Sequence, residues 1–426
     1  MNRNFRKLLF LLCFFLFITI TPLSLLYSQG YRIDLNSGDI KITQTGGLFL
    51  RIQPKEAEIY LNSKLRKKTD FLFASALIEN LIPKKYNVTV KKEGYHSWYK
   101  QLGVEEKKVI AFENILLIPE NPEFKITSTN VSDFYAIPNS KKIITKELNN
   151  DGWALKLYDT DKRIKSHLLE EKEVYSKGAE LLSLEMSPDS KNLFLEIGMK
   201  EQIKNFILNI DEGASSLQED KTPKNLLVNI VICKFLEEKN YCLDNNGNLF
   251  QSNKSFEEKI KLTESPFPIQ LETKYVLEIQ GNLIFLKENE KLYLLDEESK
   301  TFELFAEDCQ GIKKSFNSEK LVYFSEHEVW IMFLADQKSQ PYKKAGDKIF
   351  LIRLSEKIND ITWLDSDHII LSNNNKVLIG ETDERNGVNM VDLAIFDYPK
   401  IIFNQSDKKL YVLSDNNIYQ SIKLIP

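Results

Sequence analysis

From residue 46 onward, apolar and polar positions alternate in short runs, which is the period of a half-buried β-strand. Leu48, Leu50 and Ile52 share one face of the first run. No strong helical period appears between residues 124 and 426. Apart from its N-terminus, the chain is therefore predicted to be all-β.

The first 28 residues have a different pattern. Residues 8–27 are 20 positions without a charge, about the length that crosses the hydrocarbon core of a bilayer as a helix. Arg3, Arg6 and Lys7 precede this stretch, and the positive-inside rule places such a flank in the cytoplasm. We therefore predict a signal-anchor transmembrane helix over residues 1–28, a single pass in the cell membrane, with the bulk of the chain extracytoplasmic. A cleaved signal peptide is the alternative, although the sequence before Gly30 offers only a poor cleavage site.

Two segments follow the apolar stretch. Residues 29–45 are polar and are interpreted as a juxtamembrane connector. Residues 46–119 contain several short alternating runs separated by polar turns, such as "LNSK" at residues 61–64. This spacing predicts a small β-sandwich of short antiparallel strands.

The segment 46–119 also resembles a PEGA domain. The likeness lies in "LFLRIQPKEAEIYLNSK", in "LIPKKYNVTVKKEGYHSW" and in the terminal "ILLIPE". Three glycines of the family pattern are replaced by Glu56, Ser63 and Lys84, so these turns are expected to use conformations that other residues accept. The principal matching positions are Pro54, Ala57, Pro83, Tyr86, Gly94 and Tyr95.

The PEGA resemblance implies a surface-associated accessory module without shared catalytic residues. Gly94, Tyr95 and Trp98 are then expected to be structural, as a tight backbone step and aromatic packing. An exposed aromatic platform that binds sugar is the alternative role for these residues.

Residues 124–426 repeat a hairpin of two strands around a polar turn rich in Asn, Asp or Glu. Each copy has one bulky residue in its second strand. From the first of these residues to the last, 261 positions contain six steps, a mean period of 43.5. That period is typical of a four-stranded propeller blade. The seven anchor residues are Tyr158, Ile207, Phe250, Tyr293, Trp330, Leu378 and Tyr419.

A second motif precedes most hairpins and is clearest in "MSPDSKNLFL" at residues 186–195. It resembles the WD40-like repeat of Tol-B-type propellers, with Ser190 where glycine is usual. We predict a β-propeller of about seven blades over residues 124–426, closed by residues 124–128 adding a strand to the last blade. Six or eight blades, or a pair of β-sandwiches, are the alternatives.

Charge limits the classes of partner. The chain carries 57 Lys and Arg against 61 Asp and Glu, a net charge of −4. Without the three basic residues of the anchor the net charge is −7, which does not suit the neutralisation of phosphates, so no nucleic-acid partner is expected.

The four cysteines contain no C-x-x-C pair, so no zinc ribbon or thioredoxin-like motif is present. Cys233 and Cys242 flank the hairpin "CKFLEEKNYC". An outer compartment would permit a disulfide between them, but two buried free thiols are the expectation.

Candidate chemistry is sparse. The four histidines lack metal-ligand spacing, and His327 and His368 are expected to be exposed turn residues. "DNNGN" at residues 244–248 does not fit a calcium loop, because the twelfth position is Ser255 rather than glutamate. No catalytic residue, cofactor or metal ligand is predicted.

The preferred function is a membrane-anchored surface protein, in which the PEGA-like module supports a non-enzymatic propeller that binds protein or glycan. An envelope polysaccharide lyase or hydrolase, built from carboxylates of several blades, is the first alternative. An envelope-assembly scaffold of Tol-B-like type is the second. Fold analogy is the only support for a ligand at the propeller face.

Overall fold

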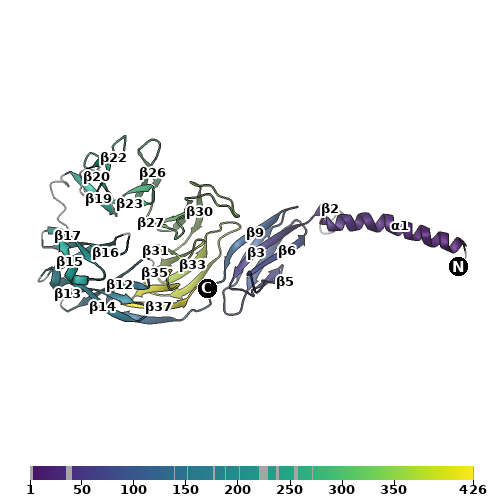
Figure 1. Ribbon diagram of the computed structural model, residues 1–426, viewed down its shortest axis with the longest axis horizontal. Helices are drawn as coiled ribbons and strands as arrows, with labels where there is room; N and C mark the ends of the chain where they lie inside the picture. The colour runs from purple at the N-terminus through teal and green to yellow at the C-terminus, as the bar shows by residue number, and fades with distance from the viewer. Residues whose placement is uncertain are drawn as a thin grey trace.

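The computed structural model consists of an N-terminal helix, a small two-sheet module and a ring of β-sheets (Figure 1). It describes residues 3–34, 41–138, 140–150, 152–175, 178–187, 189–200, 202–219, 229–236, 239–253, 258–270 and 272–425. The chain is mostly strand, as the alternating pattern predicted.

Helix α1 (Arg3–Ser28) extends away from the rest of the chain, and the apolar window within it is 0% buried (Figure 1). Only at the end of the apolar stretch does a described residue contact it, where the guanidinium of Arg32 lies 3.5 Å from the ring centroid of Tyr27. Its segment Phe5–Ser28 is long and apolar enough to cross a membrane, and a signal sequence has the same character. Pro22 lies inside the helix near its C-terminal end.

The polar segment after α1 forms more structure than the expected connector. Strands β1 (Tyr31–Asp34) and β2 (Lys41–Gln44) pair as an antiparallel hairpin. Arg32 links three elements, because its guanidinium donates to the carbonyl of Tyr27 in α1 at 2.8 Å and to Asn80 Oδ1 of the module at 2.7 Å. The end of α1 is therefore tied to the module through this hairpin.

Residues 46–119 fold as two sheets packed face to face, as the sandwich prediction required. One sheet has the order β6-β3-β9, from β6 (Ser75–Leu81), β3 (Gly46–Gln53) and β9 (Val109–Leu116). The other has the order β5-β4-β7-β8, from β5 (Lys64–Lys68), β4 (Glu58–Leu61), β7 (Lys85–Lys91) and β8 (Trp98–Gly103). The expectation of wholly antiparallel strands was wrong in one place, since β3 and β9 run parallel. The alternating residues Leu48, Leu50, Ile52, Ala57, Ile59 and Leu61 form the core between the sheets.

Two turns of the module depart from the sequence-based expectation. Glu56 has φ +62° and Ser63 has φ +66°, which is the left-handed region that favours glycine. Two of the three residues that stand where the PEGA pattern has glycine therefore have a glycine-like backbone, whereas Lys84 does not have a positive φ. Holding a residue with a side chain in this region costs roughly 1–2 kcal/mol, which the packed strands on either side offset.

Seven four-stranded sheets follow within the described residues, in agreement with the predicted number of blades. Blade 1 is β11 (Val131–Ala136), β12 (Lys142–Asn149), β13 (Gly152–Asp159) and β14 (Ile164–Glu170). Blade 2 is β15 (Ala179–Met186), β16 (Asn192–Met199), β17 (Gln202–Asn209) and β18 (Gln218–Glu219). Blade 3 is β19 (Ile230–Leu236), β20 (Lys239–Asp244), β21 (Leu249–Asn253) and β22 (Lys259–Lys261). Blade 4 is β23 (Tyr275–Gln280), β24 (Leu283–Glu288), β25 (Lys291–Leu295) and β26 (Phe302–Ala306).

The last three sheets complete the ring. Blade 5 is β27 (Gly311–Lys314), β28 (Lys320–Phe324), β29 (Glu328–Phe333) and β30 (Lys348–Arg353). Blade 6 is β31 (Ile358–Trp363), β32 (His368–Asn373), β33 (Lys376–Glu381) and β34 (Met390–Ile395). Blade 7 is β35 (Lys400–Asn404), β36 (Lys409–Ser414) and β37 (Asn417–Lys423), with β10 (Phe124–Thr129) as its fourth strand. Short helical turns α2 (Glu171–Val174) and η1 (Gly213–Ser216) occur in the connections around blade 2.

The ring closes as the sequence predicted. β10, from the start of the propeller, pairs antiparallel with β37 at its end. Blades 7 and 1 then share a buried cluster in which Tyr411 packs with Phe134 and Tyr158. Thr160 of blade 1 donates to Asp407 of blade 7 at 3.2 Å. A blade buries its two faces only against its neighbours, so this closure protects the first and last sheets.

The turn motif at residues 187–191 explains how the first two strands of blade 2 are joined. Ser187 Oγ donates to Asp189 Oδ1 at 2.6 Å and accepts from the amide of Asn192 at 2.9 Å. Ser190 has φ +59°, so it occupies the position where glycine is usual without changing the backbone. In blade 5, Ser315 Oγ accepts from the amide of Lys320 in the same way, at 2.9 Å.

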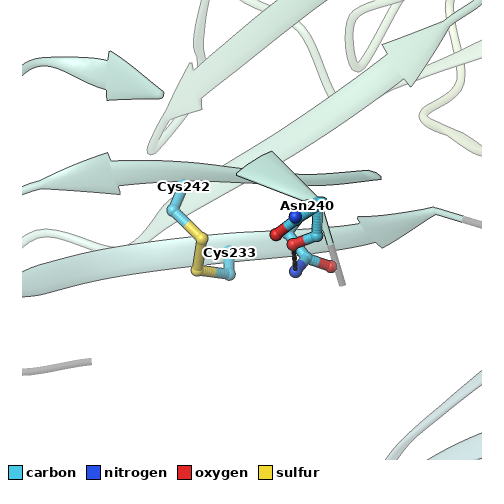
Figure 2. Close-up of a disulfide and its surroundings, with 4 residues drawn as sticks. Cys233, Asn240 and Cys242 are labelled. Atoms are coloured by element: carbon cyan, nitrogen blue, oxygen red, sulfur yellow. Dashed lines mark hydrogen bonds between the residues drawn. A yellow bond between two sulfur atoms is a disulfide. The ribbon is translucent and has the colours of Figure 1, made fainter. Parts of the chain in front are cut away.

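The expectation of two free thiols in blade 3 was wrong. Cys233 of β19 and Cys242 of β20 form a disulfide between neighbouring strands (Figure 2). The two residues are direct register partners in the antiparallel hairpin, with Cα atoms 4.1 Å apart. A spacing of nine residues suggested a hairpin, but only the register decides whether the two sulfurs meet.

Candidate functional site at the junction of the module and the propeller

The densest group of buried charges lies where the small module meets the propeller. Strands β8 and β9 of the module contact the loops at residues 334–347 of blade 5 and 382–389 of blade 6. Leu116 and Ile118, at the end of the module, are buried in the hydrophobic cluster of blades 6 and 7. The two parts are therefore joined by a packed interface as well as by the chain.

Lys100 and Glu381 form the centre of the junction. The ammonium group of Lys100 lies 2.9 Å from Glu381 Oε1, and the two side chains are 0% and 6% exposed. Lys100 also donates to the carbonyl of Asp383 at 2.8 Å. The other oxygen of Glu381 accepts from the indole of Trp98 at 2.9 Å. Both buried charges are therefore paired and hydrogen-bonded, as burial of charge requires.

Trp98 is part of this packed junction and not a platform for sugar. Its side chain is only 4% exposed. Its ring lies edge-on to Phe112 of β9, with ring centroids 5.6 Å apart. The alternative of an exposed aromatic platform is therefore overturned at this residue, because a ligand cannot reach the ring face.

Arg385 makes the second half of the contact. Its guanidinium stacks over Phe112 at 3.8 Å from the ring centroid and donates to the carbonyl of Ala111 at 3.0 Å. Asp383 holds the same guanidinium through Nε at 2.9 Å and Nη2 at 2.5 Å. Gln340 of blade 5 accepts from the amide of Ala111 at 3.1 Å. Backbone groups of β9 are thus recognised by two different blades.

His368 was expected to be an exposed turn residue, and this was wrong. It starts β32, is 4% exposed and lies 2.9 Å from Asp365 Oδ1 through Nδ1. Burial of the imidazole opposes its protonation, but the nearby carboxylates of Asp365, Asp367 and Glu381 outweigh this effect and raise its pKa. The pKa of Asp365 is lowered, because His368 outweighs the effect of burial on the carboxyl.

Although acidic and basic groups converge here, the junction leaves little space. Two cavities beside Glu381 measure about 30 and 20 Å³. A cavity needs roughly 10–15 Å³ to hold one water, so these volumes suit waters and exclude a sugar or a peptide. The groups are paired with one another across module and blade, and the arrangement is suited to fixing orientation rather than to turnover.

Sequence reasoning did not single out Lys100 or Glu381. A signal for Lys100 was present, since Trp98, Lys100 and Leu102 share the inward face of one strand, where a lysine is unusual. Nothing near Glu381 in the sequence marks it as the partner, 281 positions later in the chain.

The residues that match the PEGA pattern lie in the core and the turns of the module. Tyr86 is buried and its hydroxyl donates to the carbonyl of Ile82 at 2.9 Å. Gly94 has φ +77°, and its carbonyl accepts from the amide of Glu120. Tyr95 bridges to Pro119 and is half-buried against the module core. Ala57 lies in that core, whereas Pro54 and Pro83 occupy turns and are half-buried.

The seven anchors lie in the same strand of their blades, although Tyr158 and Ile207 lie toward the opposite end of that strand from the other five. Each lies in the third strand of its blade: Tyr158 in β13, Ile207 in β17, Phe250 in β21, Tyr293 in β25, Trp330 in β29, Leu378 in β33 and Tyr419 in β37. Tyr158 and Leu378 are buried and the others are half-buried. Five of them pack in hydrophobic clusters shared by neighbouring blades: Tyr158, Tyr293, Trp330, Leu378 and Tyr419.

The first strands of neighbouring blades approach one another and line the centre of the ring. Charged pairs connect them: Lys234 with Glu185 at 2.6 Å, Lys313 with Asp360 at 3.1 Å, and Lys400 with Asp133. Glu278 of blade 4 differs from these paired carboxylates, because burial raises the pKa of its carboxyl. The lining is therefore polar and largely self-paired.

No protein-family model matches the chain, and no curated protein sequence matches it. Solved structures resemble it in fold. YCF48 from Cyanidioschyzon merolae is 8% identical with a TM-score of 0.47, over 70% of this chain and 98% of that one. The RRP9 WD40 repeats are 11% identical with a TM-score of 0.47, over 72% and 99%. The Cps50 (Swd1) β-propeller domain of Myceliophteria thermophila is 10% identical with a TM-score of 0.45, over 70% and 99%. At these identities the likeness concerns the fold alone.

Proposed function

We propose that the chain is a membrane-anchored, extracytoplasmic binding protein whose propeller recognises a protein or glycan without catalysing a reaction. Helix α1 would hold the chain in the cell membrane with its N-terminus in the cytoplasm. The uncharged residues 8–27, within the membrane-length segment Phe5–Ser28, and the preceding Arg3, Arg6 and Lys7 support this orientation.

The observation that carries the proposal is the buried junction around Lys100 and Glu381. A flexible tether would need no buried contact between module and propeller. Here paired charges, an edge-to-face aromatic pair and two apolar residues hold the propeller at a set angle to the module. Arg32 in turn ties the module to the end of α1. Such a chain of contacts suits a stalk that presents one surface of the propeller at a fixed distance from a bilayer.

The PEGA-like segment 46–119 acts as the spacer in this proposal, and the Tol-B-like repeats form the binding part. The family resemblances stay predictions. They are consistent with an accessory module that carries no catalytic residue of its own.

Fractionation of cells that express the full chain with a C-terminal tag tests the anchor. We expect the chain to resist alkaline extraction, to keep its N-terminal segment by mass spectrometry, and to lose its tag to protease added outside the cytoplasmic membrane. The double substitution Leu11→Lys/Leu16→Lys should release it, because charges at the centre of a span oppose insertion. A mature chain that starts near Gln29, or a protected tag, would overturn this topology.

Affinity capture from envelope extracts with residues 29–426 tests the binding role. A protein or intact glycan retained in proportion to the bait supports it. Recovery of only glycan fragments cut at one linkage would replace it with the lyase or hydrolase alternative.

A further inference from the structure

A groove at the outer rim separates blade 7 from blade 1, on the side where the ring is closed. It has a volume of about 700 Å³, within the roughly 300–1,000 Å³ typical of ligand clefts. One wall is the strand β10 and the end of β37, and the other is Tyr158 with the start of β14. Lys165 of β14 donates to Ser128 of β10 at 2.7 Å and closes one end. We call this feature the basic groove.

Cationic side chains dominate the lining of the basic groove. Lys125, Arg163, Lys165, Lys409 and Lys423 line it, against the single carboxylate of Glu123. This balance is opposite to that of the surrounding domain, since residues 124–426 carry 39 Lys and Arg against 49 Asp and Glu, a net charge of −10. A local concentration of positive charge in an acidic domain favours an anionic ligand.

Three of these cations have no internal counterion. Lys125 pairs with Glu123 at 3.4 Å, and Lys165 pairs with Glu147 at 2.6 Å. Arg163, Lys409 and Lys423 form no ion pair among the residues that the structure describes. Lys409 and Lys423 are also direct partners across β36 and β37, and like charges in that position are destabilising. A bound anion would relieve this repulsion.

The remaining lining distinguishes between kinds of anion. Ile126 is 57% exposed and Ile422 is 43% exposed, and aliphatic side chains of this kind suit apolar side chains rather than sugar rings. Tyr158 is buried, so it offers no stacking surface to a glycan. β10 is the outermost strand of blade 7, and no strand among the described residues pairs with its outer edge, which leaves that edge for an extended peptide.

We propose that the basic groove binds an extended acidic segment of a partner protein, which lies along β10. The carboxylates of this segment contact Arg163, Lys409 and Lys423, and its apolar side chains contact Ile126 and Ile422. This names the partner class within the binding role proposed above, and it rests on that role. The mode is strand addition at a sheet edge, in which backbone pairing supplies affinity and side-chain contacts supply selectivity.

Fluorescence anisotropy with the full chain in detergent micelles tests the proposal. The probe is a labelled ten-residue peptide of alternating Glu and Val, and the comparison probes are the Lys-Val peptide, inorganic polyphosphate and a glucuronate-containing oligosaccharide. We expect the Glu-Val peptide to bind and the Lys-Val peptide to bind at least tenfold more weakly. Affinity for the Glu-Val peptide should fall as salt increases.

The variant Arg163→Ser/Lys409→Ser/Lys423→Ser should weaken the Glu-Val peptide at least tenfold. A matched control, Lys64→Ser/Arg66→Ser/Lys67→Ser on β5, removes the same charge from an exposed strand and should change affinity less than twofold. Ile126→Ser should weaken the peptide about threefold or more and leave polyphosphate unchanged. Circular dichroism melting confirms that each variant is folded.

Equal weakening in both triple variants would overturn the proposal, because it would show binding by overall charge. Tighter binding of the oligosaccharide or polyphosphate than of the peptide would also overturn it, in favour of a glycan or phosphate ligand. If the groove variant of residues 29–426 captures the same envelope partner as the wild type, the groove assignment fails while the proposed binding role stands. If neither captures any partner, the binding role itself fails.

Discussion

Replacement of Lys100 by Met tests whether the junction is held by its buried ion pair. Met keeps most of the aliphatic stem between Trp98 and Phe112, whose ring centroids lie 5.9 and 5.4 Å from the Lys100 ammonium. The substitution leaves Glu381, which is 6% exposed, as a buried charge; within the described part of the chain, Trp98 and Asn389 are its only remaining donors. Removing one partner of a buried pair costs about 3–5 kcal/mol, because the other charge stays desolvated.

Hydrogen exchange by mass spectrometry on the full chain in detergent measures this loss of free energy at the junction itself. If backbone amides of β8 and of residues 382–389 exchange through opening of the junction, that free energy corresponds to about a hundred- to a few-thousand-fold faster exchange. Amides of blades 2 to 4 should keep their rates, since the module contacts described above are with blades 5 to 7.

Two further variants make the result specific. Lys108→Met removes a charge from the pair with Glu105, whose side chains are 68% and 62% exposed, and should leave exchange unchanged. Lys100→Met/Glu381→Gln removes both charges and should restore exchange to within about tenfold of the wild type. An increase of less than about threefold in Lys100→Met would refute the reasoning, because Trp98 and Asn389 alone would then be enough to keep Glu381 buried.

Three other outcomes are expected. Cys233→Ser/Cys242→Ser should destabilise blade 3 by about 2–3 kcal/mol, because the disulfide closes a short loop. The loss should lower the midpoint of urea denaturation, and an unchanged midpoint would mean that the hairpin needs no cross-link. Because the pKa of His368 is raised in the fold, its protonation contributes stability that is complete below pH about 6.5 and is lost as pH rises through the folded-state pKa. Tm should therefore fall over that pH range in the wild type and change less in His368→Gln. If the two proteins show parallel profiles of Tm against pH, this histidine is not the cause. Residues 71–73 expose three large apolar side chains, each at least 70% accessible, so Ser at all three positions should reduce self-association in analytical ultracentrifugation and change the unfolding free energy by no more than about 0.5 kcal/mol.

Much of the architecture was predictable because it depends on local patterns. Side chains of a strand alternate between its faces, so Leu48, Leu50 and Ile52 marked a buried surface before any partner was known. The propeller was predictable for a related reason, since each blade repeats the same pattern. The anchors at Tyr158 and Tyr419, the first and last of the series, accordingly fall in the same strand of their blades. Closure by β10 followed from the requirement that no blade be left with an uncovered face.

The sequence by itself predicted an apolar N-terminal helix, a small β-sandwich and a propeller of about seven blades, because each of these is built from short segments whose own periodicity indicates their structure. The exact number of blades was decided by the tertiary structure. The tertiary structure alone decided the pairing of Cys233 with Cys242, since a shift of one residue in register would have parted the sulfurs. It also decided the burial of His368 and the meeting of Lys100 with Glu381. The contact of Lys100 with Glu381 joins segments far apart in the chain, and no local pattern records which distant carboxylate will compensate a buried ammonium group.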